Sequence, residues 1–176
     1  MPSIQTAHTS DLPPDTLAAA RHLLDAVFDD MTDEDWEHSL GGIHALAWDG
    51  PTLVGHSAVV QRRMVHRARA LRTGYVEGVG VHPHHRRRGH GAAMMRALEH
   101  VVRNAYDIGV LAATDEGMPF YTALGWTHWR GTISALSPAG IIPTPEEADC
   151  IYVLPVTTDL DHAAGLTCDW RDGDLW

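Results

Sequence analysis

Residues 79–91 read VGVHPHHRRRGHG, and this stretch decides the fold. It begins at the end of residues 71–81, whose apolar pattern predicts a β-strand. It ends where apolar residues start to recur at helical spacing, over residues 91–105. Pro83 cannot continue the interior of a sheet, so the strand stops before it. The sequence therefore predicts a strand, a basic turn containing glycine, and a helix in direct succession.

Such a turn is suited to binding phosphate. The backbone N–H groups of a first helical turn point outward, and the helix dipole adds positive potential there. Glycine lets a phosphate approach the backbone, and arginine binds phosphate in a bidentate manner. Neither G-x-G-x-x-G nor a P-loop is present, so this is neither type of nucleotide site. The candidate contacts are Arg86, Arg87, Arg88, Gly89, His90 and Gly91.

The rest of the chain alternates strand and helix patterns. Strands are predicted at residues 4–8, 43–48, 52–65, 108–113, 128–136 and 151–156, helices at 14–28, 33–40 and 120–124, and a loop at 137–147. This order predicts an α+β (mixed α/β) fold with a central, largely antiparallel sheet flanked by helices. The length of 176 residues is that of one domain, taken as residues 1–176.

Composition excludes several classes of protein. No apolar run reaches the roughly 18 residues of a membrane span, and no secretion signal is visible, so we expect a cytoplasmic protein without a membrane partner. Two cysteines, Cys150 and Cys168, are too few for a disulfide framework. The chain contains no lysine, which excludes a Schiff base or a pyridoxal anchor.

The charges are strongly segregated along the chain. Residues 61–103 hold ten arginines and two acids, a balance of +8, whereas the remainder carries −18. This pattern suggests an anionic ligand at the centre and a cationic ligand nearby, although solvated surface explains most charge runs. The net charge of −10 argues against nucleic acid as a partner. The histidines at 82, 84, 85 and 90 lack the spacing and carboxylates of a metal site, so we expect no metal.

The basic turn has the pattern R-x-x-G-x-G and follows a strand that ends Val-x-Pro. It resembles the pyrophosphate-binding motif of the GNAT N-acetyltransferase superfamily, which implies acetyl-CoA as cosubstrate. In that superfamily the strand before the motif splays from its neighbour, and the pantetheine arm inserts in the gap. The resemblance implies that its amides pair with the backbone near Val79 and Val81, where a free N–H stabilises the thioester oxyanion.

Three further segments resemble the aminoglycoside 2′-N-acetyltransferases: DWEHSLGGIHAL at 35–46, GYVEGV at 74–79 and CDWRDGDLW at 168–176. This likeness spans essentially the whole chain, and it implies an acetyl transfer to aminoglycosides that confers antibiotic resistance, and a homodimer. The acidic groups that match the family's drug pocket are those of Asp30, Asp35, Glu77, Glu147, Asp174 and the terminal carboxylate of Trp176. One position departs, since Ala112 stands where some relatives have serine.

The resemblance also implies roles in the reaction. Tyr121 matches the tyrosine that faces the CoA sulfur, where it can protonate the leaving thiolate, although packing in the core is the alternative. An ammonium group cannot attack a thioester, so the acceptor must lose a proton, and Glu77 is the candidate base, directly or through water.

Two other functions remain open at this stage. The acceptor could be another amine, such as an endogenous amino sugar, a polyamine or a protein. The domain could also be a non-catalytic acetyl-CoA sensor, although the presence of Glu77, Tyr121 and the whole R-x-x-G-x-G pattern argues against that.

Overall fold

A computed structural model describes residues 3–176, and its contacts divide the chain into two compact units. The N-terminal unit comprises the chain up to Val60 together with Val76–Val101, and the C-terminal unit comprises Gln61–Tyr75 and Val102–Trp176. Two strands and one helix run from one unit into the other. The division into two units does not test whether residues 1–176 act as one domain, which stays a prediction.

In the N-terminal unit, strands that follow one another in the chain pair with one another. Its elements are β1 (Ser3–His8), η1 (Thr9–Asp11), α1 (Pro14–Val27), α2 (Asp33–His38), β2 (Ile43–Asp49), most of β3 (Thr52–His66), the end of β4 (Arg69–Val81), η2 (Pro83–His85) and most of α3 (His90–Ala105). β1 pairs antiparallel with β2, and β2 pairs antiparallel with β3 across the turn at Gly50. The sequence Asp-Gly-Pro favours a tight turn at this point, and Gly50 and Pro51 form it.

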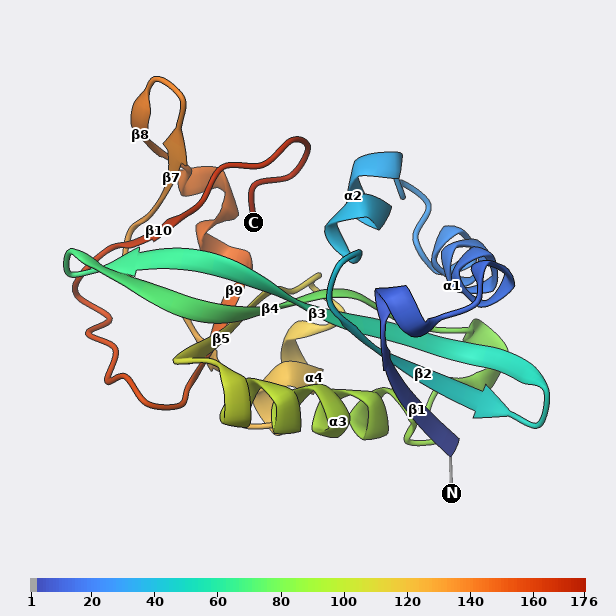
Figure 1. Cartoon of the computed structure of the whole chain (residues 1–176). Helices are drawn as coiled ribbons and strands as arrows, with labels where there is room; N and C mark the ends of the chain where they lie inside the picture. Colours follow the sequence, from blue (N-terminus) through green and yellow to red (C-terminus); the bar gives the residue numbers. More distant parts are fainter. Residues whose placement is uncertain (1–2) are drawn as a thin grey trace. The chain divides into compact units, whose positions relative to one another are not determined.

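Helices cover both faces of these strands, as Figure 1 shows. A side chain at Gly55 of β3 would touch Met94 of α3, whereas one at Gly80 of β4 would touch Leu24 of α1. α1 starts with Pro14, whose fixed φ suits a first helical turn, and it buries Leu23 and Leu24 against the sheet side. The two layers hold the end of β4, and thus residues 77–81, between α1 and α3.

The C-terminal unit contains the larger part of one ten-stranded sheet. Its order is β6-β9-β5-β4-β3-β10-β7-β8, with the remaining elements β5 (Ile108–Ala112), α4 (Met118–Ala123), β6 (Thr127–His128), β7 (Ile133–Ser137), β8 (Gly140–Pro143), η3 (Pro145–Cys150), β9 (Ile151–Pro155) and β10 (Leu166–Cys168). β4 pairs parallel with β5, and β10 pairs parallel with β7. Pairs of β9 with β5 and β6, of β7 with β8, and of β10 with β3 are antiparallel.

Two predictions about elements were wrong in this unit. The strand expected at 128–136 is two strands, β6 and β7, because the loop at residues 162–164 crosses at Gly131. A side chain there would clash with the carbonyl oxygen of Ala164. The expected loop at 137–147 contains β8, which pairs with β7, and η3. The tail contributes β10, which the sequence did not indicate. No helix within residues 3–176 is long and apolar enough to cross a membrane.

Candidate active site

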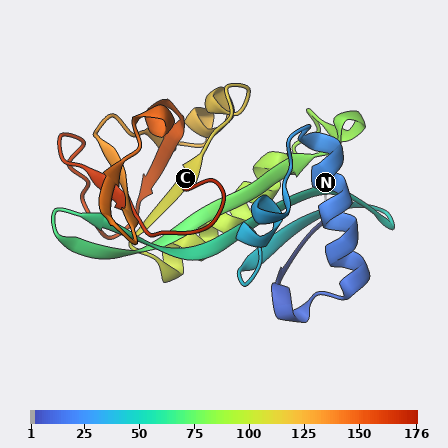
Figure 2. The same ribbon diagram turned by 90° about the horizontal axis from the view of Figure 1, so that it is seen from above.

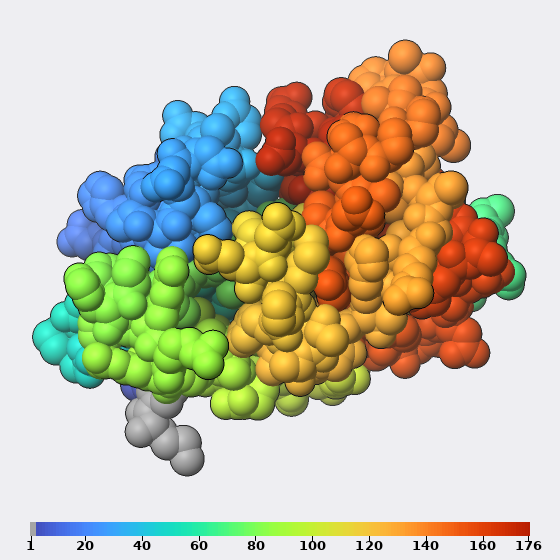
Figure 3. Space-filling model, turned by 180° about the vertical axis from the view of Figure 1, so that it is seen from behind, coloured from blue at the N-terminus to red at the C-terminus, as the bar shows by residue number. Residues whose placement is uncertain are grey.

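The basic turn follows β4, as predicted. β4 ends at Val81, and the amide of His82 donates to the carbonyl of Val54 on β3 over 2.9 Å. Helical hydrogen bonding then starts at Gly89, whose carbonyl accepts from the amide of Ala93. Gly89 has φ of +84°, and no atom lies within 4 Å of where its side chain would be. The turn therefore presents open backbone at the start of a 16-residue helix, on the surface drawn light green in Figure 3.

This geometry fits a pyrophosphate. Arg86, Arg87 and Arg88 are exposed, and Arg86 Nε donates to the carbonyl of Val81 over 3.2 Å. The imidazole of His90 is buried, so any contact of His90 with phosphate would use its backbone amide. His85 Nδ1 lies 3.4 Å from a carboxylate oxygen of Asp49. Among residues 3–176, no group of three or more potential ligands is arranged to hold a metal ion.

Glu77 lies half-buried in β4, immediately before a distortion of the strand. Gly78 has φ of +55°, a left-handed conformation that interrupts regular β geometry. A side chain at Gly78 would lie 3.0 Å from Ser39 Oγ and 3.1 Å from Leu24 Cδ1. Both the backbone angle and the crowding thus require glycine between Glu77 and Val79.

A buried histidine supports this distortion. His56 on β3 donates from Nδ1 to the carbonyl of Gly78 over 2.8 Å, and its Nε2 lies 2.9 Å from Nδ1 of His44 on β2. Sequence reasoning missed both histidines, although His44 lies inside the segment at 35–46. No local signal identifies them, because they meet only through strand pairing.

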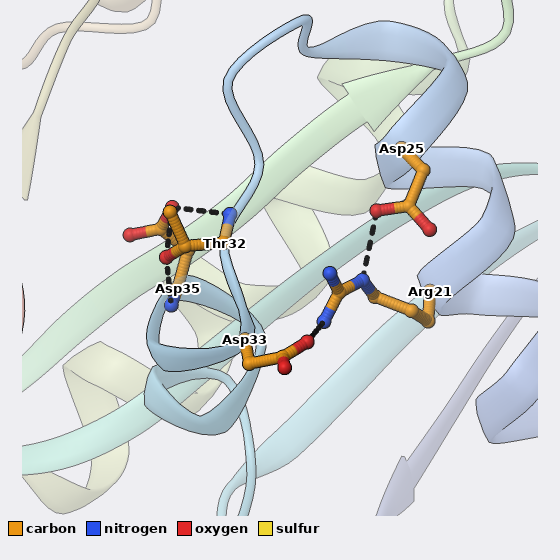
Figure 4. A network of polar contacts seen from close by, with 5 residues as sticks. All are labelled: Arg21, Asp25, Thr32, Asp33 and Asp35. Atoms are coloured by element: carbon orange, nitrogen blue, oxygen red, sulfur yellow. Dashed lines mark hydrogen bonds and ion pairs between the residues drawn. The ribbon is translucent and has the colours of Figure 1, made fainter.

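The acidic residues before and at the start of α2, which include Asp30, Asp33 and Asp35, form a cluster with a partly structural role (Figure 4). Asp35 Oδ2 accepts from both the amide and the hydroxyl of Thr32, which caps α2, so one carboxylate oxygen is used to start the helix. Arg21 of α1 binds Asp25 at 2.8 Å and Asp33 at 3.1 Å. Asp30 lies exposed in the turn between α1 and α2. Arginine thus neutralises part of the cluster, whereas Asp30 and the second oxygen of Asp35 lie outside these bonds.

Tyr121 belongs to the C-terminal unit and is buried in α4. Its ring centroid lies 5.1 Å from that of Phe120 and 6.4 Å from that of Tyr152. Burial raises the pKa of the Tyr121 hydroxyl above its usual value of 10. The hydroxyl is therefore protonated at neutral pH and can serve as a hydrogen-bond donor. A phenol with a raised pKa gives up its proton only when strong negative charge develops beside it.

The chain end is fastened to η3 through one threonine. Trp176 Nε1 donates to Thr144 Oγ1 over 2.8 Å, and both residues are buried. The carbonyl of Thr144 accepts from the amide of Glu147, so the same residue supports both the terminal tryptophan and an acidic residue. Cys150 Sγ donates to the carbonyl of Glu147 over 3.1 Å. Thr144 was not singled out in the sequence.

The segment from Cys168 to Trp176, which we call the C-terminal arm, turns back on itself (red in Figures 1 and 2). Gly173 has φ of +73° at this reversal, and Arg171 Nε donates to the carbonyl of Asp174 over 2.6 Å. The carboxylate of Asp174 is left exposed. The arm therefore brings two predicted substrate groups, Asp174 and Trp176, into one fixed turn.

A buried arginine anchors the start of the arm. Arg62 Nε donates to Asp169 Oδ1 over 2.8 Å, and its second nitrogen donates to the carbonyl of Asp169 over 3.1 Å. The guanidinium of Arg62 lies 4.6 Å from the ring centroid of Tyr75, and that of Arg171 lies 5.3 Å from it. Two cations on one aromatic ring hold the arm to the sheet.

Comparison with known proteins shows the family to which this combination of basic turn and sheet belongs. Residues 9–129 match the family model described as acetyltransferase (GNAT) domain. The chain belongs to the GNAT acetyltransferase family. This GNAT acetyltransferase is 47% identical over 174 residues to an aminoglycoside 2′-N-acetyltransferase from Mycolicibacterium fortuitum, with 96% of this chain and 89% of the relative covered. The predicted fold class and the predicted family are confirmed.

Solved structures agree on the fold. A GNAT family N-acetyltransferase (YhbS) from Escherichia coli, in complex with CoA, superimposes with a TM-score of 0.66 at 14% identity, covering 97% of this chain and 90% of that one. A GNAT family acetyltransferase from Brucella melitensis, in complex with acetyl-CoA, gives 0.61 at 14% identity, with 90% and 92% covered. The protein is an acetyl-CoA-dependent acyltransferase, as the sequence predicted.

Proposed function

We propose that this enzyme transfers the acetyl group of acetyl-CoA to the 2′-amine of aminoglycoside antibiotics and thereby confers resistance to them. The observation that carries the proposal is the fastening of the C-terminal arm to η3 through Thr144. It gives the exposed Asp174 and the terminal carboxylate fixed positions, as recognition of a polycation requires. The 47% identity to an aminoglycoside 2′-N-acetyltransferase supports the same substrate class.

Each unit contributes separate groups to this reaction. In the N-terminal unit, the turn at 86–91 would hold the pyrophosphate of acetyl-CoA, and backbone groups at Val79 and Val81 would pair with its pantetheine arm. Asp30, Asp35 and Glu77 of this unit would bind ammonium groups of the drug. In the C-terminal unit, Glu147, Asp174 and the Trp176 carboxylate would do the same.

The transfer proceeds by direct attack. Glu77, alone or through water, removes a proton from the 2′-ammonium group. The free amine nitrogen bonds to the thioester carbon, and a backbone N–H near Val79 stabilises the oxyanion. The carbon–sulfur bond then breaks, and the nitrogen releases its second proton to water as the amide forms. Tyr121 donates a hydrogen bond, and finally a proton, to the thiolate. Solvent returns that proton to Tyr121. No acyl-enzyme forms, so neither cysteine takes part.

The proposal has three further parts. Both units act as one acetyltransferase domain over residues 1–176, which the family match across their boundary supports. The protein works in the cytoplasm, where free thiols such as Cys150 and Cys168 persist. It forms a homodimer, as its resemblance to the family implies, and sedimentation analysis tests this part.

The decisive experiment measures release of the CoA thiol with two matched drugs. Tobramycin carries an amine at the 2′ position, whereas kanamycin A carries a hydroxyl there. We expect fast turnover with tobramycin and little with kanamycin A. Equal turnover on both drugs would move the acetylated position elsewhere. Turnover on neither drug, with acetyl-CoA still bound, would exclude aminoglycosides and point to another amine.

A further inference from the structure

A chain of hydrogen bonds crosses the interior of the N-terminal unit and ends beside Glu77. His44 and His56 are both 0% exposed. From the surface inward, Thr9 Oγ1 lies 2.8 Å from His44 Nε2, His44 Nδ1 lies 2.9 Å from His56 Nε2, and His56 Nδ1 lies 2.8 Å from the carbonyl of Gly78. Nothing in the proposed reaction uses these histidines.

Burial keeps both rings neutral at neutral pH, and for two neutral rings only one arrangement of protons satisfies all three bonds. The carbonyl of Gly78 can only accept, so His56 Nδ1 carries the proton. His56 Nε2 must then accept from His44 Nδ1, and His44 Nε2 must accept from the hydroxyl of Thr9. The oxygen of Thr9 in turn accepts from the amide of Gly41 over 2.9 Å. Each histidine is therefore held as one neutral tautomer.

The electrostatics agree with this assignment. Burial lowers the pKa of His44 to about 4 and that of His56 to about 3, so both rings are neutral at neutral pH. The ring of Trp36 packs beside both, with centroids 6.4 Å from His44 and 5.8 Å from His56. This series of hydrogen bonds ends on the carbonyl of Gly78, which cannot take up a proton. The bonds can therefore orient Gly78, but they cannot conduct protons.

The oriented group is a peptide unit shared by two residues. The carbonyl of Gly78 and the N–H of Val79 belong to the same planar peptide, and no peptide bond within the described residues is cis. In a trans peptide these two groups point in opposite directions. With the carbonyl turned toward His56, the N–H of Val79 points away from the histidine. A hydrogen bond to the carbonyl also polarises the amide and makes its N–H a stronger donor.

We propose that His56 is a positioning residue for acetyl transfer, held in its active tautomer by His44 and Thr9. It fixes and polarises the Gly78–Val79 peptide, whose N–H donates to the oxyanion of the thioester. This inference rests on the proposed function, in which Val79 lies along the acetyl-CoA arm. Without His56, the left-handed glycine leaves this peptide free to rotate, and the donor is no longer preorganised.

The test compares two substitutions of His56. His56→Leu removes both ring nitrogens, whereas His56→Asn keeps an N–H donor at the position of Nδ1. We expect kcat of His56→Leu to fall by about 10- to 100-fold, less than the loss of a whole oxyanion donor. The KM values for acetyl-CoA and tobramycin should stay within about twofold of wild type. His56→Asn should recover most of the lost kcat.

A matched control separates positioning from stability. His66 is also a buried histidine of β3 that bonds a glycine carbonyl through Nδ1, here that of Gly165 at 3.0 Å, but it lies in the C-terminal unit. His66→Leu should lower the melting temperature with little change in kcat. Equal losses of kcat in His56→Leu and His66→Leu, or an unchanged kcat in folded His56→Leu, would overturn the proposal.

Two further measurements keep the test decisive. If His56→Leu does not fold, His56→Gln replaces it in the comparison. The longer glutamine side chain moves the amide away from the Nδ1 position, so kcat of His56→Gln must be lower than kcat of His56→Asn. Slow hydrolysis of acetyl-CoA by water also passes through an oxyanion, so its rate must show the same deficit without any amine. A wild-type enzyme silent on tobramycin but with a His56-dependent hydrolysis rate would reject only the proposed acceptor.

Discussion

The indole nitrogen of Trp176, the last residue of the chain, donates a 2.8 Å hydrogen bond to the hydroxyl of Thr144. Only 5% of Trp176 and 2% of Thr144 is exposed, so this bond is shielded from water. A chain terminus is normally free to move, and its carboxylate is then a poor binding group because ordering it costs entropy. Here the tryptophan is already ordered before any ligand arrives, so the substrate-binding role proposed for this position would cost little further ordering.

Thr144→Val tests this relationship. Valine has nearly the same shape but accepts no hydrogen bond, and the buried indole N–H loses its partner at a cost of about 1–3 kcal/mol. We expect the arm to loosen and the KM for tobramycin to rise several-fold, with the KM for acetyl-CoA unchanged. Steady-state kinetics with each substrate varied in turn measures both values.

Thr167→Val is the matched control for that experiment. The hydroxyl of Thr167 in β10 also bonds another side chain in the same unit, but its partner is Ser134, at 2.8 Å, and not the terminal residue. Its substitution should leave both KM values unchanged. A rise in the KM for tobramycin with Thr167→Val as large as with Thr144→Val would show that general loosening of the unit, rather than the terminal carboxylate, weakens binding.

Gly78→Ala is expected to impair both folding and catalysis. Its φ of +55° is unfavourable for alanine, and the new side chain would lie 3.0 Å from Ser39 Oγ. Gly50 has nearly the same φ, +58°, but has no atom within 4 Å of that position. We expect Gly50→Ala to cost about 1 kcal/mol of unfolding free energy and Gly78→Ala clearly more. Only Gly78→Ala should also lower kcat. Urea unfolding measures the loss of stability, and steady-state kinetics measures kcat. Similar losses of stability and of kcat in the two variants would contradict this prediction.

Most of the N-terminal unit could be predicted from the sequence because its signals are local. The apolar residues of β2 and β3, the tight turn at Gly50 and the proline that starts η2 each act within a few residues. β8 and β10 could not be predicted in this way. Each is short, and each takes strand geometry from its pairing, β8 with β7 and β10 with both β3 and β7.

The residues of the candidate site also differ in whether a local sequence pattern predicts them. The turn at residues 86–91 is contiguous, so its chemistry is visible in the sequence. His44 and His56 come together only through the register of β2 and β3, in which His44 lies opposite Ala58 and His56 opposite Leu46. Thr144 and Trp176 are 32 residues apart and meet only in the folded unit. Such pairs depend on tertiary structure, which no local pattern contains.

Tyr121→Phe tests the role of the buried hydroxyl. The raised pKa of Tyr121 keeps this group protonated well above neutral pH, so ionisation of the tyrosine should not limit kcat on the alkaline side up to about pH 9. We expect Tyr121→Phe to lower kcat by about 10- to 100-fold without changing the midpoint of the acidic limb. An alkaline decline of kcat in the wild type that disappears in Tyr121→Phe would instead assign a titration below pH 9 to this hydroxyl.

The buried histidines should make the protein sensitive to mild acid. In the unfolded chain both titrate near pH 6.5, whereas in the fold the pKa of His44 is about 4 and that of His56 about 3. Between these limits the unfolded state binds up to two more protons than the folded state, so stability falls as the pH falls. The contribution is complete above about pH 6.5 and decreases by up to about 2.7 kcal/mol per pH unit toward pH 4.

Urea unfolding of the wild type and of His56→Asn between pH 4 and pH 7.5 measures this slope. Asparagine does not titrate, so one of the two protons is no longer taken up on unfolding, and the part of the slope due to this pair should be halved. His66→Leu, which leaves the pair intact, should keep that part of the slope even though its stability is lower at every pH. If His56→Asn and the wild type lose stability in parallel, carboxylates rather than these histidines control the response to acid.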